Sequence, residues 1–310
     1  MRKRFLKSDL ILILVAAVWG FAFVAQRAGM QHIGPFTYNT LRFALGALTL
    51  LPFIHFNDRI NPDNRIKLRL DNPNARLLLK GGLIAGIIIF IGASLQQSGL
   101  VFTTAGKAGF ITGLYVIFVP VFGLFLRKPV GIPTWISAIL AAVGLYYLSV
   151  RGSIAINPGD LLVFACSWVW AGHVLVIAHY SPKVAPVKLA CLQFTLASVL
   201  SMIAMFVFEA PSLYRIQLAA IPILYGGFIS AGLGFTLQVV AQRDAHPAHA
   251  SIIMSLEAVF AVFGGWLILH EILDGQAIIG CVLMLTGMLL SQIYRPAFKI
   301  KTGALPDRSE

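Results

Sequence analysis

The chain has 310 residues, of which 58% are hydrophobic and only 12% carry a charge, whereas ordinary soluble domains are about 25% charged. These proportions exclude a soluble enzyme, a disordered chain and a disulfide-stapled secreted domain. The net charge of +12 would suit a nucleic-acid partner in a soluble protein, but here the basic residues cluster between apolar runs, which indicates orientation in a membrane and no nucleic-acid partner.

Polar and Pro/Gly-containing breaks separate ten apolar runs, each close to the roughly 20 residues that a membrane-spanning helix needs. The first run follows the basic segment MRKRFLK and has no signal-peptidase-like A-x-A site, so we expect an uncleaved first span. The sequence thus predicts an all-α membrane protein with ten transmembrane helices. They are expected at 9–28, 35–55, 77–99, 104–126, 131–150, 160–179, 187–208, 217–241, 248–269 and 275–294.

The distribution of basic residues predicts the orientation of the chain. If the N-terminus lies inside, 19 of the 24 Lys and Arg residues fall in inner segments. An even number of spans then places both termini in the cytoplasm. We expect a multi-pass protein of the cell (inner) membrane, and its longest loop, 57–76, is expected to be a solvated cytoplasmic loop.

The chain repeats itself weakly but in order along its length. Gln96 aligns with Gln238 at an offset of 142 residues, and Trp19 aligns with Trp170 at an offset of 151. We therefore predict one five-helix repeat at 9–150, a second at 160–294, and a cytoplasmic tail at 295–310. Because five is odd, the second repeat must be inverted relative to the first, with a cavity between the halves lined by spans one to four and six to nine.

Four stretches carry a resemblance to a known family: WGFAFVAQRAG, LRFALGAL, TTAGKAGFITGLYVIFVPVFG and SLEAVFAVFGGWLILHEIL. They resemble the ten-span EamA-type permeases of the drug/metabolite transporter superfamily. The resemblance implies secondary transport of small metabolites, with both termini cytoplasmic. The ninth span of such permeases often reads LEP, whereas Ala258 follows Glu257 here. We therefore expect no proline-induced kink at this position.

Glu257 is the most informative candidate, since it lies about nine residues into the ninth span. A charge near the bilayer centre costs about 2.5–3.5 kcal/mol on insertion scales, so this side chain should face the interior, be partnered or be protonated. We interpret it as a site for a substrate ammonium group or for a proton. A structural hydrogen-bonding hub between helices is the alternative.

Arg42 belongs to a polar stripe along the second span, together with Tyr38 and Asn39 at helical spacing. Arginine can hold a carboxylate with two hydrogen bonds, so we interpret Arg42 as a substrate-binding residue. Snorkelling to the outer headgroups or a fixed ion pair is the alternative. We hypothesise that Arg42 and Glu257 offer opposite charges to a zwitterionic solute, or pair with each other when the site is empty.

The remaining candidates are weaker. Lys107 is a candidate substrate contact near the outer start of the fourth span, although snorkelling is the more ordinary role. His173 is a candidate for carrying a proton because histidine titrates near neutral pH, and a packing role is the more ordinary one. The other candidate cavity residues are polar or aromatic side chains within apolar runs: Gln26, Gln97, Trp19 and Tyr115.

No catalytic or metal-binding group stands out. The residues around Gly106 and Lys107 do not form a P-loop, and His270 and Glu271 lack the second histidine of a zinc helix. The three cysteines lie in separate apolar runs and are expected to be small core residues. We expect no enzyme activity, cofactor or metal.

The sequence favours a secondary transporter of small organic metabolites, such as amino acids, acting by alternating access, with export as one direction that the sequence leaves open. The alternatives are a membrane-embedded enzyme or a receptor or channel. The expected partners are a small solute and the lipid bilayer. Whether the protein forms a homodimer is left open by the sequence.

Overall fold

The computed structural model describes residues 2–60, 72–103, 105–126, 130–149, 158–269 and 275–293, and all regular structure in these ranges is helical. The first half contains α1 (Arg2–Gly29), α2 (Pro35–Ile60), α3 (Pro73–Phe102), α4 (Ala105–Gly113), α5 (Tyr115–Phe125) and α6 (Ile132–Ser149). The second half contains α7 (Pro158–Tyr180), α8 (Pro186–Phe208), α9 (Leu213–Leu218), α10 (Ala220–Leu224), the π-helix η2 (Tyr225–Phe235), α11 (Thr236–Gln242), α12 (Pro247–Met254), α13 (Glu257–Leu269) and α14 (Gly275–Ile293). The predicted all-α class is confirmed.

Seven helical segments are long and apolar enough to cross a membrane: Leu6–Gly29, Pro73–Phe102, Ala108–Phe125, Pro158–Tyr180, Pro186–Phe208, Ala220–Gln242 and Pro247–Gly264. Two shorter apolar helices, Ile132–Tyr147 and Ile278–Leu290, fall at the fifth and tenth predicted spans. Helix α2 covers the second predicted span over 26 residues. Helix α2 is not one of the seven segments, because the polar stripe lowers its mean hydropathy. The chain is thus a multi-pass membrane protein.

Proline marks the start of several helices. Pro35, Pro73, Pro158, Pro186 and Pro247 are each the first residue of a helix. The first turn of a helix suits proline, because the backbone N–H that proline lacks would have no partner there and its fixed φ already matches the helix. These residues therefore set where five of the described helices begin after each turn of the chain.

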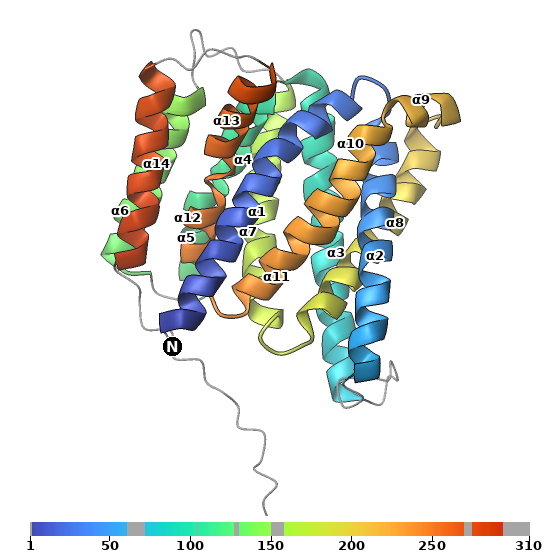
Figure 1. Cartoon of the computed structure of the whole chain (residues 1–310), viewed down its shortest axis with the longest axis horizontal. Helices are drawn as coiled ribbons and strands as arrows, with labels where there is room; N and C mark the ends of the chain where they lie inside the picture. The colour runs from blue at the N-terminus through green and yellow to red at the C-terminus, as the bar shows by residue number, and fades with distance from the viewer. Residues whose placement is uncertain are drawn as a thin grey trace, which may run out of the picture.

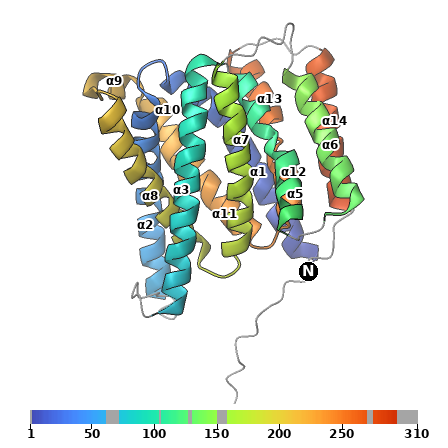
Figure 2. The ribbon, with the colours of Figure 1, turned by 180° about the vertical axis from the view of Figure 1, so that it is seen from behind.

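The central helices stand side by side in two layers, and a pair of packed helices lies on each side of them. Figure 1 shows α1 and the α10–η2–α11 span in front, and the reverse view in Figure 2 shows α3 and α7 in front. Helices α6 and α14 pack together at one edge of the bundle, and α2 and α8 pack together towards the other. Helices α12 and α13 pack against α1, and α3 packs against both α7 and α8.

Polar contacts at both ends show that α2 and α8 run in opposite directions. At the end of α2, Asp58 pairs with Lys188 at the start of α8, with 2.8 Å between Nζ and Oδ1. At the end of α8, the Glu209 carboxylate accepts hydrogen bonds from the backbone N–H groups of Phe36 and Thr37 at the start of α2, at 2.7 and 2.8 Å.

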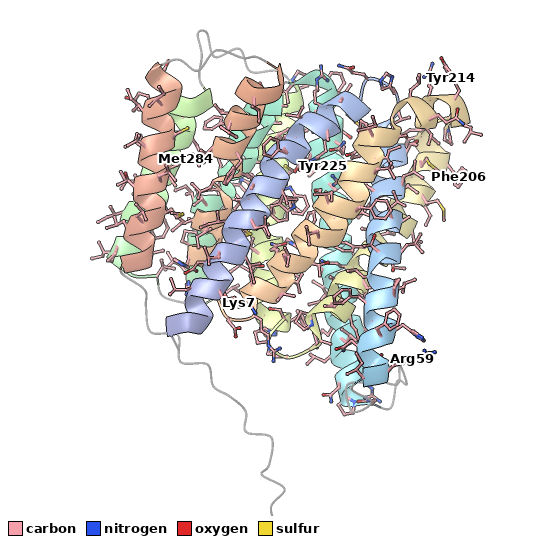
Figure 3. All side chains as sticks on the ribbon, in the orientation of Figure 1. Lys7, Arg59, Phe206, Tyr214, Tyr225 and Met284 are labelled. Atoms are coloured by element: carbon pink, nitrogen blue, oxygen red, sulfur yellow. The ribbon has the colours of Figure 1, made fainter. Side chains whose placement is uncertain are left out.

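Figure 3 places Lys7 and Arg59 at the lower end of the bundle and Tyr214 at its upper end. Lys7 and Arg59 therefore lie at one end of the bundle and Tyr214 at the other.

Glycine allows α6 and α14 to pack closely. A Cβ atom at Gly144 would lie 2.7 Å from the carbonyl oxygen of Gly280 and 2.9 Å from the backbone nitrogen of Met284. A Cβ atom at Gly287 would lie 2.7 Å from the carbonyl oxygen of Ser137. Real Cβ atoms do not approach backbone so closely, so the two helices must separate if either glycine gains a side chain.

We predict that Gly144→Ala destabilises the folded protein, because overpacking a tight contact costs about 1–3 kcal/mol. Thermal unfolding of the purified protein in detergent measures the effect. Gly172→Ala is the matched control, since a Cβ at this helical glycine meets nothing within 4 Å. Equal melting temperatures for the two variants would contradict this account of the α6–α14 contact.

Candidate functional site

A buried pocket lies in the middle of the bundle and takes its walls from both halves of the chain. The space between its walls, including the part open to solvent, is about 500 Å³. Pockets for small organic ligands are mostly apolar with a few polar groups. The lining residues are Trp19, Phe23, Gln26, Arg42, Gln96, Thr112, Tyr115, Trp170, His173, Val174, Ser230, Phe235, Gln238, Met254 and Glu257.

The pocket lies between the halves, as the sequence predicts, and its walls come from almost all of the predicted spans. Spans one to four contribute through α1, α2, α3, α4 and α5, and spans six, eight and nine contribute through α7, η2, α11, α12 and α13. Span seven, which is α8, supplies no lining residue in the described part of the chain. It instead packs outside the pocket against α2 and α3.

Two helix breaks place polar side chains on the pocket wall. The fourth span is interrupted at Leu114, so Tyr115 begins α5, and the ninth is interrupted at Ser255 and Leu256, so Glu257 begins α13. Around the second break the backbone makes short-range bonds, from Leu256 N to Ile253 O and from Ala258 N to Ser255 O, each 3.2 Å. Such i→i+3 bonds tighten a helix without proline. The ninth span is therefore interrupted even though its Leu-Glu dipeptide lacks the following proline.

Glu257 is buried, with 3% of its surface exposed, and its Oε1 atom has no hydrogen-bond partner. The Tyr115 side chain also lines the pocket and interacts with the Glu257 carboxyl group. A carboxylate at the first turn of a helix is favoured by the helix dipole, which offsets only part of its burial. The Glu257 carboxyl group is therefore held in the pocket wall with bonding capacity unused.

Arg42 is also buried, with 2% of its surface exposed, so it does not extend to the lipid headgroups. Its guanidinium carbon lies 4.5 Å from the centroid of the Phe43 ring and 5.6 Å from that of Tyr38. Cation–π contacts of this kind stabilise a guanidinium by about 0.5–2 kcal/mol. Its Nε atom has no hydrogen-bond partner. Among the described residues, no ion pair or hydrogen bond joins Arg42 to Glu257.

A chain of hydrogen bonds fixes one wall of the pocket. The indole Nε1 of Trp170 donates to Gln96 Oε1 at 2.8 Å, and Gln96 Nε2 donates to Gln26 Oε1 at 2.9 Å. This chain links α7, α3 and α1 with buried side chains. Next to it, His173 Nε2 lies 3.1 Å from Gln193 Oε1. Buried amides and indoles that are bonded in this way hold their rotamers and preorganise the wall.

Aromatic rings form the apolar part of the pocket. The centroid of Phe235 lies 4.6 Å from that of Trp19 and 5.6 Å from that of Trp170. Trp19 Nε1 also donates to the carbonyl oxygen of Ser230 in η2, at 3.4 Å. The pocket thus combines flat apolar surfaces with a few polar groups, which suits an organic solute better than a bare ion.

Six of the residues predicted for the site or for proton coupling line this pocket: Glu257, Arg42, Gln26, Trp19, Tyr115 and His173. Tyr38, Asn39 and Gln97 are buried but do not line it. The Tyr38 hydroxyl donates to the carbonyl oxygen of Pro222, and Gln97 Nε2 reaches the Met30 sulfur at 3.5 Å. Lys107 lies in α4, but its side chain is outside the described residues.

The site residues predicted from the sequence leave out nine lining residues: Phe23, Gln96, Thr112, Trp170, Val174, Ser230, Phe235, Gln238 and Met254. The internal repeat contained a signal for one of them, because Trp170 is the repeat counterpart of Trp19. Val174, Phe235 and Met254 are ordinary apolar residues of apolar helices and carry no signal of their own. No group of three or more metal-ligating residues occurs in the described ranges.

Comparison with solved structures identifies the fold. A solved protein structure superposes with a TM-score of 0.74 and covers 93% of this chain and 96% of the other, at 16% sequence identity. At this identity the match shows that the two chains share a fold and carries no information about the solute.

Comparison with known sequences identifies the family. A transporter of Archaeoglobus fulgidus, described as uncharacterized, is 32% identical over 287 residues, which are 92% of this chain and 85% of the relative. A probable amino-acid metabolite efflux pump of Salmonella typhimurium is 25% identical over 305 residues, covering 92% and 94% of the two chains. The EamA-like transporter family matches residues 6–150 and 157–292, almost the whole chain. The chain therefore belongs to the EamA-like transporter family.

Proposed function

We propose that this protein is a secondary transporter of small zwitterionic organic solutes of the amino-acid type, acting by alternating access. The observation that carries the proposal is the presence of Arg42 and Glu257 in one buried pocket, with no ion pair between them. A buried unpaired charge is costly in hydrocarbon surroundings. A solute with a carboxylate and an ammonium group supplies the missing partner to each side chain.

The charge pattern discriminates among solutes. An anion would satisfy Arg42 and leave Glu257 unpaired, and a simple amine would do the reverse. Charge-assisted hydrogen bonds contribute about 1.5–3 kcal/mol each, and a buried group that stays unpaired loses this amount or more. The aromatic rings of Trp19, Trp170 and Phe235 then provide a surface for the apolar remainder of the solute.

The packing of α2 and α8 supports the inverted repeat on which alternating access depends. Cys191 Sγ contacts the carbonyl oxygen of Ala47 at 3.8 Å, and Ser198 Oγ donates to that of Thr40 at 2.9 Å. At the repeat offset of 151, Cys191 corresponds to Thr40 and Ser198 to Ala47 (191 − 40 = 198 − 47 = 151). Exchanging the halves therefore turns one contact into the other, as a twofold axis requires.

The packing of α6 and α14 gives the same support from different residues. Gly144 faces Gly280 and Met284, whereas Gly287 faces Ser137 and Ala141. An offset of 143 relates Gly144 to Gly287, Ser137 to Gly280 and Ala141 to Met284 (287 − 144 = 280 − 137 = 284 − 141 = 143). In this pair too the equivalent helices run in opposite directions, which is the relation expected of inverted repeats.

We propose that two contacts between the halves close the pathway between the pocket and the two sides of the membrane. His249 Nε2 in α12 lies 3.2 Å from Asp9 Oδ1 in α1. Asp160 in α7, which aligns with Asp9 in the repeat, accepts a hydrogen bond from Thr103 Oγ1 at 2.7 Å. In the proposed cycle these two contacts open alternately and give the pocket access to one side of the membrane at a time.

We extend the proposal to the organisation of the chain. It comprises repeats at 9–150 and 160–294 with a tail at 295–310, resides in the cell membrane, and has cytoplasmic termini. The similarity to a probable amino-acid metabolite efflux pump supports an amino-acid-like solute. Both halves of one chain build the described pocket, so the proposal requires no second copy.

We predict that Glu257→Gln lowers the apparent affinity for a transported amino acid by roughly ten- to a hundredfold, because it removes one charge-assisted hydrogen bond. Counterflow into proteoliposomes measures the effect, with each of the twenty standard amino acids tested as the solute. The variant should remain monodisperse, because glutamine preserves the shape of the side chain. Normal transport by a folded Glu257→Gln variant would make Glu257 structural and remove it from the site.

We predict a comparable loss of affinity for Arg42→Lys. Lysine keeps the charge but loses the planar fork that binds a carboxylate through two hydrogen bonds. The matched control is Arg215→Lys, at an exposed arginine remote from the described pocket, which should leave counterflow unchanged. If Arg42→Lys also transports normally, a carboxylate does not bind at Arg42.

A further inference from the structure

Gln238 presents an unused hydrogen-bond acceptor to the pocket. It lies in α11, is only 1% exposed, and lines the pocket described above. Its Oε1 atom is buried and has no hydrogen-bond partner. A buried amide oxygen without a partner carries an uncompensated desolvation penalty, so a donor arriving in the pocket would be stabilised there.

Comparison with Gln96 makes this free acceptor distinctive. Gln96 is the repeat counterpart of Gln238 (238 − 96 = 142) and lines the same pocket. Gln96 Oε1 accepts from Trp170, and Gln96 Nε2 donates to Gln26. The protein thus satisfies this glutamine in its first half and leaves the acceptor of the equivalent glutamine open in its second half.

We infer that Gln238 determines specificity for primary amines by accepting an N–H from the ammonium group of the bound solute. The inference rests on the proposed function, in which the ammonium group binds Glu257. Glu257 and Gln238 line the same pocket. A primary ammonium has three N–H donors, and in this proposal it donates to both Glu257 Oε1 and Gln238 Oε1. A trimethylated ammonium has none and would leave both oxygens unpaired.

The aromatic rings of the pocket favour a different kind of ammonium group. Trp19, Trp170 and Phe235 would by themselves favour a quaternary ammonium, because aromatic faces attract methylated cations. The two free oxygens of Glu257 and Gln238 act against this preference. Discrimination between a primary amine and its trimethylated form therefore reports which feature dominates.

The test begins with counterflow of the twenty standard amino acids into proteoliposomes of the full chain. The most strongly transported amino acid is then compared with its own N-methyl and N,N,N-trimethyl derivatives as inhibitors. We expect the wild-type protein to bind the primary amine at least tenfold more tightly than the trimethyl derivative. In Gln238→Met, which is similar in size but lacks the acceptor, the amino acid should lose about tenfold in affinity and the discrimination should fall towards one.

Gln242→Met is the matched control. Gln242 lies one turn further along α11, is also 1% exposed and has two unpartnered amide atoms, but it does not line the pocket. This variant should keep both the affinity and the discrimination of the wild type. Gln238→Leu provides a second replacement without an acceptor should Gln238→Met fail to fold, and monodispersity in detergent establishes folding for each variant.

The outcomes separate this inference from the proposed function. If no standard amino acid is transported, the proposed function fails and this inference fails with it. If an amino acid is transported but Gln238→Met and Gln238→Leu keep full discrimination, only the role of Gln238 is overturned. Equal binding of the primary and trimethylated forms by the wild type, or an equal effect of Gln242→Met, would also overturn it.

Discussion

The burial of an acidic and a basic side chain in one apolar bundle is the constraint on which this structure depends. Arg42 and Glu257 are both buried in one pocket, and no ion pair joins them within the described chain. The Phe43 and Tyr38 rings stabilise the guanidinium, and the first turn of α13 favours the carboxylate. Neither effect replaces a full counter-charge. The proposed solute brings two opposite charges and so supplies a partner to each side chain.

The irregular parts of the backbone are concentrated around this pocket. Two spans break at equivalent positions of the repeat, before Tyr115 and before Glu257, and a third contains the π-helix η2. A Cβ atom at Gly234 in η2 would lie 2.9 Å from Trp19 Nε1, so glycine allows η2 to approach α1 closely. Irregular backbone within a membrane is tolerated where protein or a cavity surrounds it, and π segments frequently occur at functional sites. By contrast, α6 and α14 at the edge of the bundle are regular helices.

The general architecture could be predicted because its physical causes are local in sequence. Apolar runs predict helices, and a charge in such a run is costly whatever surrounds it, which is why Glu257 and Arg42 could be found. Which neighbour a residue faces depends on tertiary packing, and the periodicity of apolar residues along the sequence does not determine that neighbour. Gln96 and Gln97 are adjacent, yet only Gln96 lines the pocket, because consecutive residues point about 100° apart around a helix. The break before Glu257 involves neither proline nor glycine, so the sequence carries no feature that predicts it.

The central claim is that the pocket binds a solute through two opposite charges at once. Thermal unfolding of the purified protein tests it most directly, since a ligand stabilises the state that binds it. The protein is melted with leucine or phenylalanine, with the corresponding amines that lack the carboxylate, and with the corresponding acids that lack the amino group. We predict that an amino acid raises the melting temperature and that its amine and its acid do not. Equal stabilisation by the amine or the acid alone would contradict the account.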